Sequence, residues 1–227
     1  TVSNGKHVVT APNADAKTAV MYQYNESGIP VGMYVWKLSY RQGAYLATPI
    51  PGLENLMSYH GFSIRITGKS GIRAMTGVST EVRSALLSSG VEGYHLKEYG
   101  TLIMSDANRT SYPMIKGGEK VLDGMAYGYD ASGKFSDVAF ATVDGRYHYT
   151  SVLMGLPAEQ YKTVFAFRGY MVLTLDGTDV VIYGPVMSRS IYALAEQLLT
   201  MGYYTEGSEA DVFLRKIMTD ADSITGS

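Results

Sequence analysis

The run from Thr163 to Leu175 constrains the fold most, because it is apolar on both faces of a β-strand. Side chains alternate along a strand. One face therefore carries Phe165, Phe167, Met171, Leu173 and Leu175, and the other carries Val164, Ala166, Arg168, Tyr170 and Val172. Such a strand is typical of the middle of a sheet that is covered on both sides. The sequence therefore predicts a central, doubly covered strand.

Most of the remaining chain also has the pattern of strands. The first 50 residues contain four strand-like runs, "KHVVTAP", "KTAVMYQYN", "GMYVWKLSY" and "AYLATPI", which are separated by segments of turn composition. Helical periodicity is clearest from Ile191 to Leu199, and a second helix is expected from Ser208. These features predict a β-rich α+β fold of antiparallel, sandwich-like sheets with a few peripheral helices, including a C-terminal helical segment.

A connector in "TPIPGLENLMSYHG" divides the predicted strands into two groups, because two closely spaced prolines disfavour a helix there. We place a boundary near Leu56. Residues 1–56 are then a small β module, either immunoglobulin-like or a hairpin. Residues 57–227 are the β-rich α+β main domain.

Arg168 is the one charged residue in the apolar central strand, and an unpaired buried guanidinium is too costly to persist. The segment "LKEYGTLIM" presents the converse problem, since Glu98 shares a face with Leu96, Leu102 and Met104 and Gly100 leaves a gap. We expect Arg168 and Glu98 to form a structural ion pair, with Arg73 in the same network. A catalytic role for Glu98 is the alternative.

Aromatic residues recur in pairs two positions apart, which places each pair on one face of its strand. The pairs Tyr34 with Trp36 and Tyr147 with Tyr149 are candidate platforms for sugar rings. Packing in the core is the alternative for either pair. Tyr34 and Trp36 are the preferred pair, because the polar side chains of Lys37, Tyr40 and Arg41 lie close to them in the sequence and could contact the same ligand.

Several classes of function have no support in the composition. A net charge of -2 gives no field that gathers nucleic acid, and no apolar run is long enough for membrane insertion. The chain has no cysteine, and its four histidines lack ligand spacing, so we expect no metal site, although a calcium ion in a loop stays open. "GYDASGKF" nearly matches a phosphate-binding loop but is expected to be a hairpin turn. We therefore expect no cofactor and assign no catalytic residue.

Four segments, "GFSIRITGKSGIRAMTGVS", "LKEYGTLIM", "YTSVLMGLPAEQYKTVFAFRGYMVL" and "YGPVMSRSIYALAEQLL", resemble a module of secreted, multi-domain surface proteins of anaerobic Gram-positive bacteria. Its pattern is a GIRF-like strand, an EYGTLI strand, an F-x-A-R-x-Y strand and an SRSIYxLA helix. The resemblance spans about Gly61 to Leu199, with Ala74 in the phenylalanine position of the first motif. It implies export and a non-catalytic role, with no established activity.

From these observations we expect an extracellular or cell-surface, non-enzymatic module, although this chain begins without a signal segment. Such a module would bind a glycan or a cell-surface protein, or space other modules. The alternatives are a polysaccharide hydrolase with a carboxylate acid or base, and a structural protein that forms homomeric contacts.

Overall fold

The computed structural model describes residues 2–3, 6–7, 17–26, 28, 30–41, 44–139 and 141–225. Its pairings between strands are all antiparallel. The described residues form three sheets of three to five strands and a short two-stranded ribbon. The β-rich α+β class predicted from the sequence is therefore confirmed.

The five-stranded sheet has the order β10-β9-β8-β13-β14. Its strands are β8 (His95–Ser105), β9 (Leu122–Tyr129), β10 (Phe135–Asp137), β13 (Phe165–Leu175) and β14 (Thr178–Arg189). The four-stranded sheet has the order β11-β12-β7-β6. It consists of β6 (Met57–Arg65), β7 (Gly71–Ser79), β11 (Ala141–Val143) and β12 (Arg146–Met154).

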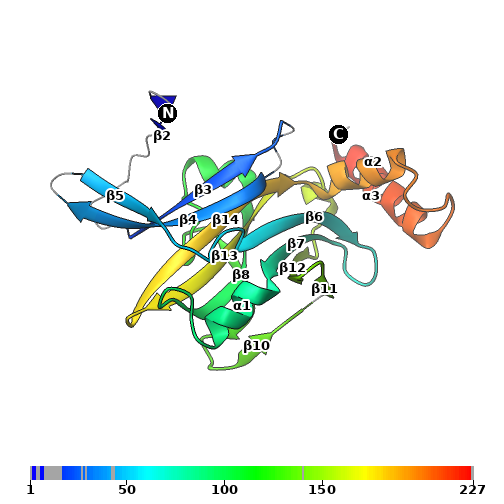
Figure 1. Cartoon of the computed structure of the whole chain (residues 1–227). Coiled ribbons are helices and arrows are strands. Elements are labelled where there is room, and N and C mark those ends of the chain that lie inside the picture. The colour runs from blue at the N-terminus through cyan, green and yellow to red at the C-terminus, as the bar shows by residue number, and fades with distance from the viewer. Residues whose placement is uncertain are drawn as a thin grey trace.

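The N-terminal part forms the remaining sheets. A three-stranded meander contains β3 (Thr18–Tyr24), β4 (Pro30–Arg41) and β5 (Ala44–Pro49), and the ribbon pairs β1 (Val2–Ser3) with β2 (Lys6–His7). Figure 1 shows β4 and β5 projecting from one side of the molecule and the C-terminal helices lying at the other. Whether residues 1–56 fold independently stays a prediction, but Met33 and Val35 of β4 are buried in a core shared with Tyr99 and Tyr149 of the larger sheets.

Helices lie at the margins of the sheets. α1 (Thr80–Leu87) follows β7 directly and is capped by Ser79, whose hydroxyl accepts a hydrogen bond from Val82 N. α2 (Ile191–Thr200) and α3 (Glu209–Thr225) form the predicted C-terminal helical segment, and Ser190 caps α2. Two 3-10 turns, η1 (Asp106–Thr110) and η2 (Ala158–Gln160), lie in the loops. No helix in the described ranges is long and apolar enough to cross a membrane.

β13 is the central strand that its sequence predicts. It pairs with β8 on one side and with β14 on the other. Phe167, Met171 and Leu173 enter the cores between the five-stranded sheet and its neighbours. On the opposite face, Ala166, Tyr170 and Val172 pack beneath Met114, which belongs to the loop after η1. Both faces are thus covered, one of them by a loop.

Candidate functional site

Arg168 lies on the loop-covered face of β13, where backbone carbonyl groups satisfy its guanidinium. Its Nε donates to Gly184 O at 3.0 Å, and its Nη1 donates to Met114 O at 3.0 Å. The guanidinium carbon lies 4.5 Å from the centre of the Tyr183 ring, within the range of a cation–π contact. Arg168 therefore anchors the loop after η1 to the sheet through neutral acceptors.

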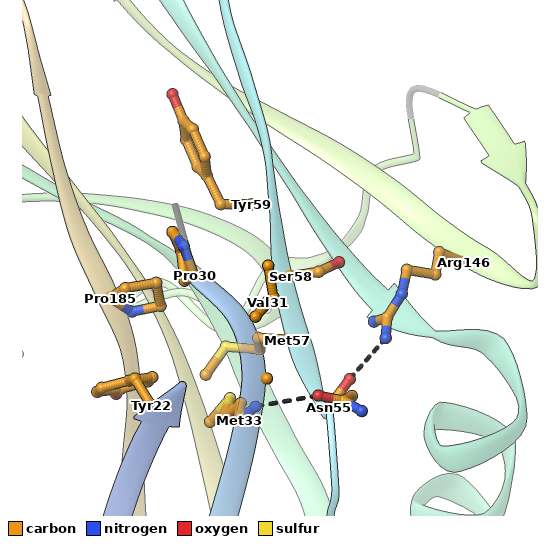
Figure 2. Close-up of a pocket in the computed structure, with 11 residues that line it drawn as sticks. Tyr22, Pro30, Val31, Met33, Asn55, Met57, Ser58, Tyr59, Arg146 and Pro185 are labelled. Atoms are coloured by element: carbon orange, nitrogen blue, oxygen red, sulfur yellow. Dashed lines mark hydrogen bonds between the residues drawn. The ribbon is translucent and has the colours of Figure 1, made fainter. Parts of the chain in front are cut away.

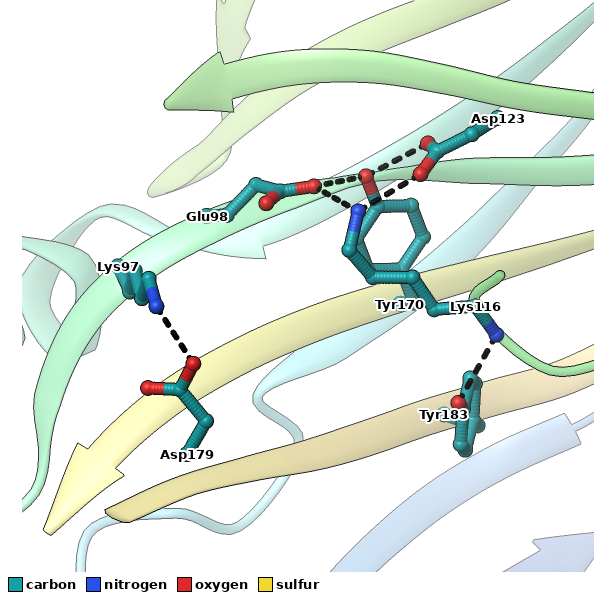
Figure 3. Close-up of polar contacts among 7 residues, drawn as sticks. All are labelled: Lys97, Glu98, Lys116, Asp123, Tyr170, Asp179 and Tyr183. Atoms are coloured by element: carbon teal, nitrogen blue, oxygen red, sulfur yellow. Dashed lines mark hydrogen bonds and ion pairs between the residues drawn. The ribbon is translucent and has the colours of Figure 1, made fainter. Parts of the chain in front are cut away.

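Glu98 belongs to a separate cluster on the same face (Figure 3). Lys116 Nζ bridges the two carboxylates of the cluster, at 2.6 Å from Glu98 Oε1 and 2.7 Å from Asp123 Oδ2. The Tyr170 hydroxyl forms a short hydrogen bond with Glu98 and another of 2.6 Å with Asp123 Oδ1. Burial raises the pKa of Tyr170, and its bonds to the two carboxylates raise it further.

The expected ion pair between Arg168 and Glu98 is therefore wrong, and the strand register explains why. Arg168 pairs with Leu102, whereas Glu98 pairs with Val172 four positions along β13. That offset corresponds to roughly 13 Å at about 3.3 Å per residue. Tyr170 stands between them opposite Gly100, and it takes the space that this glycine leaves.

Arg73 lies on a different face from both groups. It lies in β7, where Ile72 and Ala74 point into the core between the sheets. Alternation places Arg73 on the outer face of the four-stranded sheet. The predicted three-residue network is thus replaced by two local arrangements, one around Arg168 and one around Glu98.

The contacts of the Glu98 cluster fix the loop that carries Lys116 to the five-stranded sheet. Burial by itself would lower the pKa of Lys116, but its bonds to Asp123 and Glu98 raise that pKa above its usual value. Lys116 N also donates to the Tyr183 hydroxyl at 3.0 Å, so the loop is fixed at its backbone as well. Both carboxylates are held by the same ammonium group, which ties β8, β9 and the loop together.

The second candidate platform, Tyr147 with Tyr149, lies in the interior, and that prediction is wrong. Tyr149 is fully buried, and its hydroxyl donates to Gly100 O at 3.0 Å. Tyr147 donates to Asp137 Oδ1 at 2.6 Å and lies under Arg83, whose guanidinium carbon is 4.3 Å from its ring centre. This pair faces the five-stranded sheet, because β12 belongs to the layer packed against that sheet.

Tyr34 and Trp36, in contrast, occupy the outer face of the N-terminal sheet. They alternate with Met33 and Val35, which are buried on the other face. Both rings are partly exposed. Tyr34 pairs with Met21, and Trp36 pairs with Ala19 and Pro49. Residues paired in this way share a face.

The same outer face continues towards the far end of β4. Tyr40 pairs with Tyr45, and their ring centres lie 5.1 Å apart in an edge-to-face arrangement. Tyr40 is 51% exposed. Lys37 pairs with Thr18 and Thr48 on the opposite face, so its side chain does not extend the surface beside Trp36. The side chain of Arg41 lies outside the described residues.

We call this surface the aromatic face and define it by the residues that pairing and alternation place together. None of its members carries a charge. They are Ala19, Met21, Gln23, Gly32, Tyr34, Trp36, Leu38, Tyr40, Tyr45, Ala47 and Pro49.

A cavity of about 270 Å³ lies where the N-terminal sheet meets the larger sheets (Figure 2). Pro30, Val31 and Met33 of β4, Met57 and Ser58 of β6, and Pro185 of β14 line it together with Asn55 and Arg146. Asn55 has a positive φ of 52° and joins these elements. It exchanges hydrogen bonds with the backbone of Met33, and its carbonyl accepts from Arg146 Nη2 at 2.9 Å.

Two histidines that the sequence did not connect lie near this cavity on the outer face of the four-stranded sheet. The rings of His60 and His148 are 4.0 Å apart, above Gly77, where an added Cβ would come within 2.5 Å of His60 Nε2. His60 Nε2 also contacts the Ser58 hydroxyl at 2.7 Å. Burial lowers the pKa of His60, and the nearby His148 and Arg146 lower it further. Eighty-eight residues separate the two rings in sequence, so no local motif could reveal the pair.

No group of three or more histidine, aspartate or glutamate side chains in the described part of the chain is arranged to hold a metal ion. The segment "DANRT" is η1, where Asp106 pairs with Arg109 at 2.7 Å and accepts a hydrogen bond from Ser188. In "GYDASGKF", Asp130 accepts hydrogen bonds from the backbone of Ser132 and Lys134, which closes a turn between β9 and β10.

Comparison with known proteins gives no family. No family model matches the chain, and no curated protein matches it. Among solved structures, it is similar to a DUF3823 family protein from Bacteroides ovatus ATCC 8483, with 9% identity and a TM-score of 0.35 over 84% of this chain and 95% of that one. The function must therefore be argued from the site itself.

Proposed function

We propose that this chain is a non-catalytic binding module that holds a glycan against its aromatic face. The observation that carries the proposal is the partly exposed, uncharged arrangement of Tyr34, Trp36, Tyr40 and Tyr45 across two adjacent strands. Rings fixed on a sheet lose little conformational freedom on binding. They offer flat apolar surfaces to the C–H faces of sugars, and the tyrosine hydroxyls at their margins can form hydrogen bonds to sugar hydroxyls.

The lack of charge on the aromatic face favours a neutral oligosaccharide. Strand spacing of about 4.8 Å and rings at alternate positions along β4 give a row of stacking sites, which suits a chain of sugars better than a single one. A location outside the cell, where such ligands are abundant, is part of the same proposal.

The hydrolase alternative has weaker support, because the carboxylate expected to act as an acid is held by Lys116 and Tyr170. Homomeric assembly through the aromatic face remains the competing account, since exposed apolar surface also serves protein contacts. The two accounts predict different results in the same experiment.

Trp36 is the only tryptophan in the chain, so its fluorescence reports directly on the aromatic face. We expect a neutral oligosaccharide identified on a glycan array to shift this emission in a saturable way. Tyr40→Ala should weaken the response about tenfold or more, and Trp36→Ala should abolish binding on the array. Tyr203→Ala is the matched control, because Tyr203 is 65% exposed in the turn between α2 and α3.

Sedimentation of the same proteins tests the competing account. If the wild type forms dimers that Trp36→Ala dissociates, and the array stays blank, the aromatic face is an assembly surface and the glycan proposal is wrong. Glycan binding that survives both Trp36→Ala and Tyr40→Ala would also contradict it.

A further inference from the structure

The cavity at the junction of the sheets is lined by Arg146, whose charge no acid in the described part of the chain balances. No ion pair joins Arg146 to a carboxylate in the described residues. Its Nη2 donates to the neutral carbonyl of Asn55, while its Nη1 is buried and has no hydrogen-bond partner among the residues that the structure describes. A buried N–H of a charged group that lacks a hydrogen-bond partner destabilises the folded protein. An anion in the cavity that Arg146 lines would balance the charge of its guanidinium.

The described surroundings of Arg146 add no negative charge that would balance its guanidinium. Burial lowers the pKa of Arg146, and no neighbouring charge opposes this shift. His148 occupies the next position on the same face of β12, and its buried Nε2 has no hydrogen-bond partner among the described residues. The His60 ring lies against the His148 ring. Of the acids of the chain, only Asp15 lies outside the described residues.

The cavity has two chemically different sides. Figure 2 shows Tyr22, Pro30 and Pro185 on one side and Ser58, Asn55 and Arg146 on the other, whereas the Tyr59 hydroxyl points away. A ligand that fits this lining has an anionic group for the guanidinium, hydroxyl groups for Ser58 and Asn55, and a less polar edge for the proline and tyrosine rings. One guanidinium matches the single charge of a carboxylate better than the double charge of a phosphate monoester.

We propose that the cavity between β4, β6 and β14 binds a small hydroxylated carboxylate of the size of a sugar acid, with its carboxylate on Arg146. This site is separate from the aromatic face, which lies on the opposite side of β4 from Met33. The proposal does not depend on glycan binding at that face.

Ligand-observed NMR and calorimetry with galacturonate test the proposal, with galactose and acetate as the matched probes. We expect galacturonate to bind with a Kd on the order of 1 mM, and each of the two controls at least about tenfold more weakly. Equal binding of galactose removes the need for a carboxylate, and equal binding of acetate removes the need for the hydroxylated body. Either result, or the absence of galacturonate binding at about 20 mM, overturns the proposal.

Two variants test whether galacturonate binds in this cavity. Arg146→Gln should abolish binding, with Arg109→Gln as the control for loss of a positive charge elsewhere, since Arg109 pairs with Asp106 on the surface. Because Arg146→Gln also changes the bond to Asn55, Val31→Glu is the second variant. Val31 is 56% exposed at the cavity, so this change is expected to leave the fold intact and weaken galacturonate binding about tenfold or more, while Val31→Gln retains it.

Asp15→Asn completes the set. Galacturonate affinity unchanged from the wild type supports a site that is open to the ligand. An increase in galacturonate affinity of about tenfold or more shows that the Asp15 carboxylate already binds the guanidinium of Arg146, and this overturns the proposal. Retained galacturonate binding in a folded Arg146→Gln protein overturns it as well. Loss of oligosaccharide binding in Trp36→Ala, with galacturonate binding intact, would show that the two sites act separately.

Discussion

Removal of Lys116 should destabilise the protein more than removal of any surface cation, because two carboxylates depend on it. Glu98 is 13% exposed and Lys116 is 31% exposed, so water compensates the loss only in part. With Lys116→Met, the single hydrogen of the Tyr170 hydroxyl must serve both Glu98 and Asp123. We expect a loss of about 2–3 kcal/mol in the free energy of unfolding.

A double-mutant cycle isolates the interaction between Glu98 and Lys116. Glu98→Gln keeps an acceptor for Tyr170 and should cost about 1 kcal/mol. The double variant should cost less than the sum of the single variants, which gives a coupling energy of about 1–1.5 kcal/mol. At this chain length, the loss in Lys116→Met corresponds to a fall in Tm of roughly 4–12 °C. Urea unfolding followed by circular dichroism measures all four proteins.

The neighbouring pair Lys97–Asp179 in Figure 3 is the internal control. Its nitrogen–oxygen distance is 2.5 Å, but its side chains are 56% and 43% exposed. The same cycle there should give a coupling of at most a few tenths of a kcal/mol, which high salt removes. Equal coupling for the two pairs would refute the reasoning, because burial would then have no part in the difference.

Two further variants test other parts of the structure. Tyr149→Phe removes a buried hydrogen bond to Gly100 O and should lower the free energy of unfolding by about 1–2 kcal/mol, with an unchanged urea m-value; a loss within error would show that the carbonyl finds another donor. His60 has a lowered pKa in the folded protein, mainly through burial, so the unfolded chain binds more protons once the pH falls below about 6.5. Stability should therefore decline from pH 7 towards pH 5, and His60→Gln should flatten that decline in urea midpoints; the same slope in both proteins would contradict the assignment.

The sequence predicted the features that depend on local pattern. Alternation along the strand from Thr163 to Leu175 assigned Phe167 and Tyr170 to opposite faces, and the structure places them in separate cores. The periodicity of Ile191–Leu199 and the cap at Ser190 likewise identified α2. Such signals are carried by neighbouring residues, so a single sequence contains them.

The pairing of charges could not be predicted in the same way, because it depends on register. Glu98 and Arg168 do share a face, but they lie four positions apart along the paired strands, because Glu98 is opposite Val172 and not opposite Arg168. The useful signal was Gly100, since a glycine on an apolar stripe indicates space for a large neighbour, here Tyr170. Lys116 gave no signal, because it lies in a polar loop whose path over the sheet is set by tertiary contacts.

The two aromatic pairs show the same limit. Tyr34 with Trp36 and Tyr147 with Tyr149 have the same spacing, yet one pair is partly exposed and the other is inside. The difference lies in the layer to which each strand belongs. β12 is sandwiched against the five-stranded sheet, whereas β4 turns only Met33 and Val35 towards the core.

Asn55 connects two parts of the molecule at one point. Its backbone and side chain hold Met33, and its carbonyl receives Arg146. A pull on the first strands would therefore load the bonds of Asn55, together with the hydrogen bond between the Tyr22 hydroxyl of β3 and Tyr183 O of β14. Through the bond between Asn55 and Arg146, part of that mechanical load would reach β12 directly, without passing across β6 and β7.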